Sequence, residues 1–292
     1  MQQPFDRNRE DLGNMVGLEH VNVQVPDQQL ATVFYVSGLG LTRDPYLMTG
    51  IDNMWINVGG RSQFHLPTGP AQVLRGHVGL VLPDRAALLR RLERVREPLA
   101  GTAFAFRECE GWVEVTSPWG NRHRCFAPEP RFGPVTLAMP YVELEVPVAS
   151  AEGISRFYRD IVGAPATVRD DGEGRRAIVS AGPEQALIYR ETAGALPAYD
   201  GHHIQVYVAD FAGPHRRLGE YGLISEESDQ HQYRFKEIVD PAGKKPLFTL
   251  EHEVRSMRHP LFARPLVNRD PAQTNRHYRP GFDELRCSMP AE

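Results

Sequence analysis

Three kinds of sequence feature are scarce in this chain, and each absence excludes a class of protein. The 292 residues include three cysteines, Cys109, Cys125 and Cys287, an odd number at wide spacing that fits neither a disulfide framework nor a zinc finger. No run of about 18 apolar residues occurs, so the sequence predicts no membrane-spanning helix. The N-terminus is polar and has no apolar signal core, so we expect a cytoplasmic protein without a membrane partner.

An excess of basic charge is also missing. The formal net charge is -4, which argues against a nucleic-acid surface. Hydrophobic residues make up 41% and charged residues 24%, which is the composition of a soluble globular protein with ample material for a core. A chain of 292 residues is long enough for two domains of ordinary size.

One short alternating segment occurs four times. The copies read LEHVNVQVPD, RGHVGLVLPD, MPYVELEVPV and GHHIQVYVAD. At one matched register they place His20, His77, Tyr141 and His203, spaced about 60 residues apart. Alternate residues of a strand point to one face, so matched registers direct matched side chains to equivalent places. Repeated histidines at one such register indicate a metal-binding scaffold.

Each copy begins a repeat with room for one helix and about four strands. Glycines such as Gly38 and Gly40 end the first predicted helix, and Asp84 is a predicted N-cap for the second. The predicted helices span residues 28–37, 85–95, 152–161 and 215–221. The predicted strands span residues 20–25, 54–58, 63–66, 77–82, 103–108, 112–116, 122–126, 141–146, 177–180, 186–189, 203–208, 234–239 and 247–254.

The four repeats form a duplicated pair. Repeats one and three share a helix with a Phe-Tyr pair, whereas repeats two and four share an Arg-Arg-Leu helix. This predicts two domains of two repeats each, joined by a proline-rich linker. The predicted boundaries are an N-terminal extension 1–15, a first domain 16–127 with repeats 16–70 and 75–127, a linker 128–136, a second domain 137–254 with repeats 137–192 and 199–254, and a C-terminal tail 255–292.

These repeats resemble the βαβββ modules of the vicinal oxygen chelate superfamily, which includes glyoxalase I, bleomycin resistance proteins and extradiol dioxygenases. The resemblance rests on Leu-Glu-His20-Val, Gly-His77-Val-Gly, Gly-His-His203-Ile, the turn Asp240–Gly243 and the ending Leu-Phe-Thr-Leu-Glu251. It covers about residues 16–254. It implies an α+β fold in which four βαβββ modules pair into two cupped mixed-sheet domains.

The resemblance further implies a divalent metal inside one cup, with the second domain as its usual place in four-module members. His203 and Glu251 match metal-ligand positions of that domain. Tyr141 stands where the third ligand, a histidine, is expected, and Glu143 lies two residues along on the same face. A site of His203, Glu251 and Glu143 would suit Fe(II) or Mn(II), the metals we expect. No pattern for an organic cofactor is evident.

The first domain offers a rival site. His20, His65 and His77 stand at strand positions that carry ligands in relatives of this kind, and three histidines can hold a metal. The carboxylate expected at the end of the second repeat is absent, because His123 or Arg124 occupies that region. The alternative is that this domain is structural and that its histidines are hydrogen-bonded core residues.

Several further side chains are candidates near a metal. Tyr141, Tyr207 and Tyr189 are predicted catalytic groups, since a phenol beside an open metal position can donate or accept a proton. His202 and His252 alternate to the face opposite His203 and Glu251, so we interpret them as packing or surface residues.

The sequence therefore predicts a metal-dependent enzyme similar to the two-domain dioxygenases, acting on a small molecule that chelates the metal through adjacent oxygens. Two alternatives remain open: a glyoxalase-like lyase, isomerase or epimerase, and a metal-free binding or resistance protein. The arginine-rich tail 255–292 is a candidate contact for a homo-oligomer.

Overall fold

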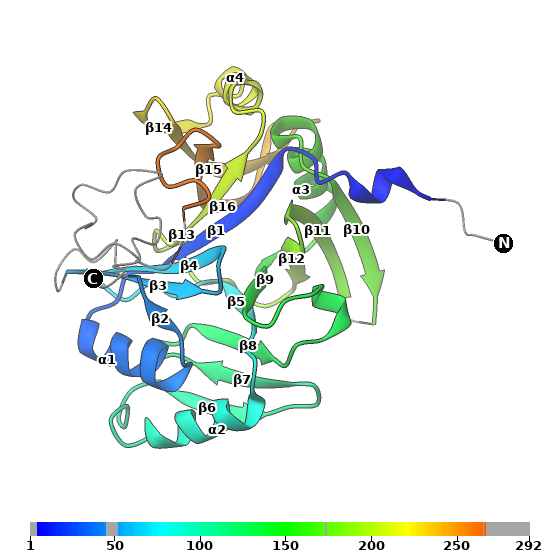
Figure 1. Cartoon of the computed structure of the whole chain (residues 1–292). Helices are drawn as coiled ribbons and strands as arrows, with labels where there is room; N and C mark the ends of the chain where they lie inside the picture. Colours follow the sequence, from blue (N-terminus) through cyan, green and yellow to red (C-terminus); the bar gives the residue numbers. More distant parts are fainter. Residues whose placement is uncertain (1–4, 45–51, 173, 265, 267–292) are drawn as a thin grey trace, which may run out of the picture. The chain divides into compact units, whose positions relative to one another are not determined.

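The computed structural model of the chain describes residues 5–44, 52–172, 174–264 and 266 (Figure 1). It divides into two compact units, one formed by residues 19–139 with Arg258 onward and the other by residues up to Leu18 with 140–257. Of the tail 255–292, the structure describes residues only as far as 266. Within the described ranges, no helix has both the length and the apolar character needed to cross a membrane.

Each unit contains two modules built as a strand, a helical segment and three further strands. Module 1 consists of β1 (Met15–Asn22), α1 (Gln28–Thr32), η2 (Val33–Gly38), β2 (Thr42–Arg43), β3 (Asn53–Val58) and β4 (Ser62–Pro67). Module 2 consists of β5 (Gly76–Val81), α2 (Arg85–Arg94), β6 (Ala105–Glu108), β7 (Trp112–Thr116) and β8 (Arg122–Phe126). Short 3-10 turns, η1 (Arg7–Glu10) and η3 (Pro130–Phe132), lie outside the modules.

The second half of the chain repeats this plan. Module 3 consists of β9 (Ala138–Pro147), α3 (Ala151–Phe157), η4 (Tyr158–Val162), β10 (Ala166–Asp171), β11 (Gly174–Gly182) and β12 (Gln185–Thr192). Module 4 consists of β13 (His203–Val208), α4 (Ala212–Glu220), β14 (Ile224–Asp229), β15 (Gln232–Asp240) and β16 (Lys245–Ser256).

The strands of every module follow one order. The first strand pairs in parallel with the last strand, the third strand pairs antiparallel with the last, and the second pairs antiparallel with the third. This gives the order β1-β4-β3-β2 and its three equivalents. The predicted α+β fold with four βαβββ modules is confirmed. The edge strands β2, β10 and β14 had no counterpart among the predicted strands, because their largely exposed, charged sequences lack apolar alternation.

The Phe-Tyr helices begin as predicted but change their winding. Asp27 caps α1 by accepting hydrogen bonds from the backbone N–H groups of Gln29 and Leu30, at 2.7 and 2.9 Å. The segment then widens into the π-helical η2, as α3 widens into η4. Gly163 ends η4 with a φ of 83°, a left-handed conformation in which glycine has no steric cost.

The helical segment of module 1 covers one face of its sheet. Tyr35 of η2 lies 5.0 Å from Phe64 of β4, measured between ring centroids, and both rings are buried. Because strand neighbours alternate, Gln63 and His65 lie on the opposite face. Each module therefore has a helix-covered face and a second face, which in module 1 is lined by polar side chains.

Within the unit formed by modules 1 and 2, the modules meet through their helix-covered faces. The ring of His123 on β8 lies 5.5–6.0 Å from those of Phe34, Tyr35 and Phe64. Arg91 of α2 donates hydrogen bonds to the backbone carbonyls of Gly38 and Leu39, which end η2. Burial among these rings lowers the pKa of His123 to about 4, so the imidazole is neutral at ordinary pH.

Modules 3 and 4 meet in the same way. Phe157 packs on Phe235 with ring centroids 5.8 Å apart, and Tyr158 hydrogen-bonds to Nε2 of His252 at 2.5 Å. His252 stacks on Phe235, and burial lowers its pKa to about 4. Tyr158 also hydrogen-bonds to Tyr189, and burial raises the pKa of both phenols. His252 is therefore a packing residue, as its register predicts.

The strand order adds one fact about how the four modules are joined into sheets. The first strands β1 and β5 belong to different sheets, and so do β9 and β13. The faces that carry His20 and His77 are opposite to the helix-covered faces, which meet inside the unit. Strand alternation predicts two faces but cannot predict which face each module turns toward its neighbour.

Replacing His123 with leucine should reduce the loss of stability in acid. The unfolded chain protonates this imidazole near its ordinary pKa of 6.5, whereas the folded chain resists protonation down to about 4. Stability is therefore fully present above about pH 6.5 and falls as pH drops toward 4, by about 2 kcal/mol per such group between about pH 7.5 and pH 5.

The measurement is urea unfolding of the wild type and His123→Leu at both pH values. The half-exposed His231→Gln variant is the control, and it should lose as much stability in acid as the wild type. An equal acid loss in His123→Leu and the wild type would contradict the role of His123.

Candidate functional site

The polar faces of the four modules differ at equivalent strand positions. First strands carry His20, His77, Tyr141 or His203, each in register with a residue of the last strand. On the last strand of each module, two residues lie on the same face of the sheet as this first-strand residue. They are Gln63 and His65 in module 1, Arg122 and Arg124 in module 2, Ala186 and Ile188 in module 3, and Glu251 and Glu253 in module 4. Only modules 1 and 4 therefore combine a first-strand histidine with histidine or carboxylate on the last strand.

Module 1 brings two imidazoles together. A ring nitrogen of His20 on β1 and one of His65 on β4 lie within 4.8 Å of each other, which is close enough for both to bind one ion. Trp55 of β3 stacks on His65 at 3.8 Å and meets the edge of His20 at 4.9 Å between ring centroids. His20 is fully buried, and Trp55 is 7% exposed. The stacked indole fixes the orientation of His65 and shields the pair from water.

Polar side chains continue along this face of module 1. Gln63 donates hydrogen bonds to Asp44 at 2.8 Å and to Asn57 at 2.6 Å, and all three side chains are buried. Arg264, from the segment that follows β16, donates to Asp44 at 2.7 Å. The Arg264 and Asp44 side chains are 1% and 0% exposed, so the two opposite charges form a buried ion pair.

The same segment is attached at a second point. Asn57 donates a hydrogen bond to the backbone carbonyl of Leu266 at 2.5 Å. Residues 258–264 and 266, here called the C-terminal strap, therefore cover part of the polar face of module 1. The strap reaches Gln63, which is in register with His20 and two residues from His65.

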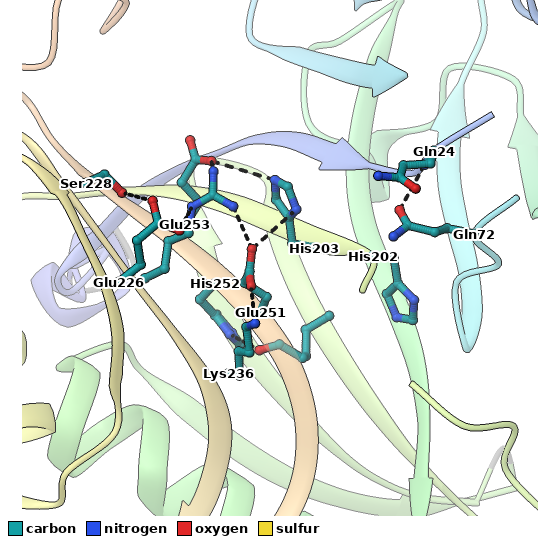
Figure 2. A network of polar contacts seen from close by, with 12 residues as sticks. Gln24, Gln72, His202, His203, Glu226, Ser228, Lys236, Glu251, His252 and Glu253 are labelled. Atoms are coloured by element: carbon teal, nitrogen blue, oxygen red, sulfur yellow. Dashed lines mark hydrogen bonds and ion pairs between the residues drawn. The ribbon is translucent and has the colours of Figure 1, made fainter. Parts of the chain in front are cut away.

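Module 4 places His203 between two carboxylates (Figure 2). Its Nδ1 lies 3.6 Å from Glu251 and its Nε2 lies 3.7 Å from Glu253. Arg234 of β15 spans both carboxylates, at 2.6 Å from Glu251 and 2.5 Å from Glu253. His203 and Glu251 thus meet in register as predicted, but Arg234 occupies the carboxylate oxygens.

Two further cations contact this network. Lys236 lies 3.2 Å from Glu251, and Arg255 lies 2.6 Å from Glu253. A metal bound by these carboxylates would have to displace or share contacts with three cationic side chains. The imidazole nitrogens of His20 and His65 are ligand atoms that suit a divalent ion, and the Trp55 ring packs against both of their rings.

Glu143 does not join His203 and Glu251. It lies on β9, in a different sheet from β13 and β16. Arg190 holds its carboxylate with two hydrogen bonds, at 2.6 and 2.9 Å. The predicted ligand set is divided because modules 3 and 4 pack through their helix-covered faces, which turn the strand faces of Glu143 and His203 away from that contact.

The rival set of three histidines is divided in the same manner. His20 and His65 come together, whereas His77 lies on β5, in register with Arg122. Arg124 is on the His77 face, with its guanidinium 5.3 Å from the Trp112 ring centroid. Arginines beside His77 oppose a cation there. His123 alternates to the helix-covered face and is not a ligand candidate.

The three predicted catalytic tyrosines have different surroundings. Tyr207 lies on the His203 face of β13 and is 4% exposed. Tyr141 is half-buried on β9, on the face of Glu143. Tyr189 is fully buried on the opposite face, where it hydrogen-bonds to Tyr158. The structure therefore does not bring Tyr189 to a polar face.

Several residues of these faces were not among the sequence-based candidates. Glu253 was detectable, because it lies two residues after Glu251 and alternation places both on one face. Trp55 and Arg234 come from β3 and β15, which carry none of the repeated motif. Arg264 carries no sequence signal, since its partner Asp44 is 220 residues away.

Solved structures share this fold over most of the chain. A candidate dioxygenase from Bacillus subtilis superposes with a TM-score of 0.58 at 17% identity, over 90% of this chain and 89% of its own. Glyoxalase I from Zea mays gives a TM-score of 0.55 at 12% identity, over 82% of this chain and 92% of its own. No protein-family model and no curated protein matches the sequence. The likeness establishes the fold alone.

Breaking the buried ion pair should release the C-terminal strap. Asp44→Asn or Arg264→Gln removes one charge of this buried pair, and breaking such a pair costs about 3 kcal/mol or more. Amide hydrogen exchange in residues 258–264 should then accelerate by about 100-fold. Hydrogen-exchange mass spectrometry measures this directly.

The control is Arg96→Gln, which removes an exposed ion pair with Glu93 on another element. An exposed pair contributes little, so exchange in the strap should not change. Unchanged exchange in Asp44→Asn and in Arg264→Gln would show that the pair does not hold the strap.

Proposed function

We propose that this chain, which has the fold of the vicinal oxygen chelate proteins, is a metal-dependent enzyme acting on a small molecule with two adjacent oxygens. The observation that carries the proposal is the imidazole pair of His20 and His65 on the polar face of module 1. Their ring nitrogens lie within 4.8 Å of each other, on strands that the fold holds in fixed register.

The residues present fit a divalent metal. Neutral imidazole nitrogens suit Fe(II), Zn(II) and neighbouring first-row ions, and Mn(II) is also compatible with a mixed nitrogen and oxygen set. His20 and His65 would supply two of the protein ligands. When bound, such an ion polarises oxygen atoms of the substrate and, if redox-active, supports chemistry with molecular oxygen.

Neighbouring side chains would bind and orient the substrate. The amide of Asn22, in register with His65, can both donate and accept hydrogen bonds. Trp55 offers an apolar ring surface that shields the site from water. On module 4, His203 and Glu251 remain a predicted pair of metal ligands. Tyr207 remains a predicted proton donor.

We favour oxygen-dependent cleavage of the substrate, with a glyoxalase-like proton transfer as the alternative. The likeness to the Bacillus subtilis candidate dioxygenase supports the first, and the likeness to the Zea mays glyoxalase I supports the second. Both reactions use a substrate that offers adjacent oxygens. They differ in whether molecular oxygen is consumed.

Metal analysis tests the site. Protein purified without chelators and loaded with Fe(II) or Mn(II) should hold the ion, and His20→Ala or His65→Ala should lose most of it. The buried His123→Leu variant is the matched control, because it removes an imidazole from the helix-covered face and should retain the metal. His203→Ala in the same series tests the predicted ligand of module 4.

If both His20→Ala and His65→Ala retain the metal, the proposed metal site is not on module 1. A wild type that binds no divalent ion under these conditions would instead favour a metal-free binding protein.

Oxygen uptake separates the two reactions. With Fe(II)-loaded protein and a series of catechols and 2-oxo acids, turnover should consume oxygen in proportion to product. Product formation without oxygen uptake, from an oxo-acid or a thiol adduct, would contradict the dioxygenase and support the glyoxalase-like alternative.

A further inference from the structure

A buried carboxylate contacts the first-strand histidine of module 1. Oε2 of Glu19 lies 3.2 Å from Nδ1 of His20, and the two side chains are 6% and 0% exposed. Consecutive strand residues point to opposite faces, so alternation alone does not produce this contact. Burying a carboxylate is costly unless it is hydrogen-bonded or paired, so the contact with His20 offsets part of that cost.

This arrangement is specific to module 1. The residue before the equivalent first-strand position is Gly76 in module 2, Pro140 in module 3 and His202 in module 4. Module 1 is therefore the one module of the four with a carboxylate at this position, beside a first-strand histidine whose ring nitrogen lies within 4.8 Å of one of His65.

We propose that Glu19 is a positioning residue that fixes the tautomer and orientation of His20. Its carboxylate accepts the Nδ1–H of the neutral imidazole, which leaves the lone pair on Nε2 as the metal-binding nitrogen. A carboxylate behind a ligand histidine raises the basicity of the ligand and holds its ring plane, and removal of such a partner typically costs about 10- to 100-fold in metal affinity.

The consequence for metal binding rests on the function proposed above, whereas the effect on the imidazole does not. Tautomer selection is a property of the metal-free protein. It can be observed without a substrate, a metal or an activity, so the two claims can fail separately.

The test uses Glu19→Met, which keeps the side-chain length and removes the acceptor. Long-range nitrogen-proton NMR of the metal-free protein, at about pH 8 where histidine is neutral, reports which ring nitrogen carries the proton. Wild-type His20 should carry it on Nδ1. Glu19→Met should shift the proton toward Nε2 and weaken Co(II) binding by about 10- to 100-fold.

Glu19→Gln is the conservative variant. Its amide oxygen can still accept from Nδ1 without the negative charge, so it should keep the wild-type tautomer and recover part of the Co(II) affinity. If Glu19→Met does not fold, Glu19→Gln still reports whether the negative charge at this position affects Co(II) binding. The matched control is Asp200→Asn, because Asp200 contacts Nδ1 of His202 at 2.6 Å and His202 lies outside the imidazole pair.

The control should disturb His202 and leave both His20 and Co(II) binding unchanged. An unchanged His20 tautomer in Glu19→Met overturns the positioning role. If Glu19→Met shifts the His20 tautomer but leaves the Co(II) affinity unchanged, Glu19 does not position His20 for metal binding, and the proposal is also overturned. If the wild type shows the Nδ1 tautomer but binds no Co(II), the proposed function fails while the action of Glu19 on His20 stands.

Discussion

Alternation along the first and last strands of each module determines most of what this chain can do. One set of side chains packs under a helix, and the other set remains available for polar contacts. In module 1, Phe64 enters the aromatic core while His65, its neighbour, stacks on Trp55 on the other face. A shift of one residue in register would exchange the two sets, so the packing of the core also fixes the polar face.

The helix-covered faces preserve the duplication more closely than the polar faces do. His123 and His252 occupy equivalent positions on β8 and β16, and burial lowers the pKa of both to about 4. Arg91 and Arg217 each donate to carbonyls near the end of the π-helical segment in the neighbouring module. The polar faces, in contrast, have diverged to imidazoles, arginines, apolar residues or carboxylates. Among the described strands, modules 1 and 4 are the two that combine a first-strand histidine with a histidine or carboxylate on the last strand.

The sequence alone predicted the four modules, most strands and the register that joins His203 to Glu251. These predictions succeeded because strand alternation and the helical Phe-Tyr motif are local signals. The division of the expected ligand sets could not be predicted, because the same alternation recurs four times and says nothing about which faces meet. Contacts such as Asp44 with Arg264 join residues far apart in the chain and leave no periodic trace.

The central claim is that a divalent ion binds at the imidazole pair of module 1. Anomalous diffraction from crystals grown with Mn(II), recorded on both sides of the manganese edge, locates the ion without reference to activity. The account predicts a peak about 2.0–2.3 Å from one ring nitrogen of His20 and one of His65. A peak on the arginine-flanked face of His77, or none beside His20 and His65 in Mn(II)-loaded crystals, would contradict it.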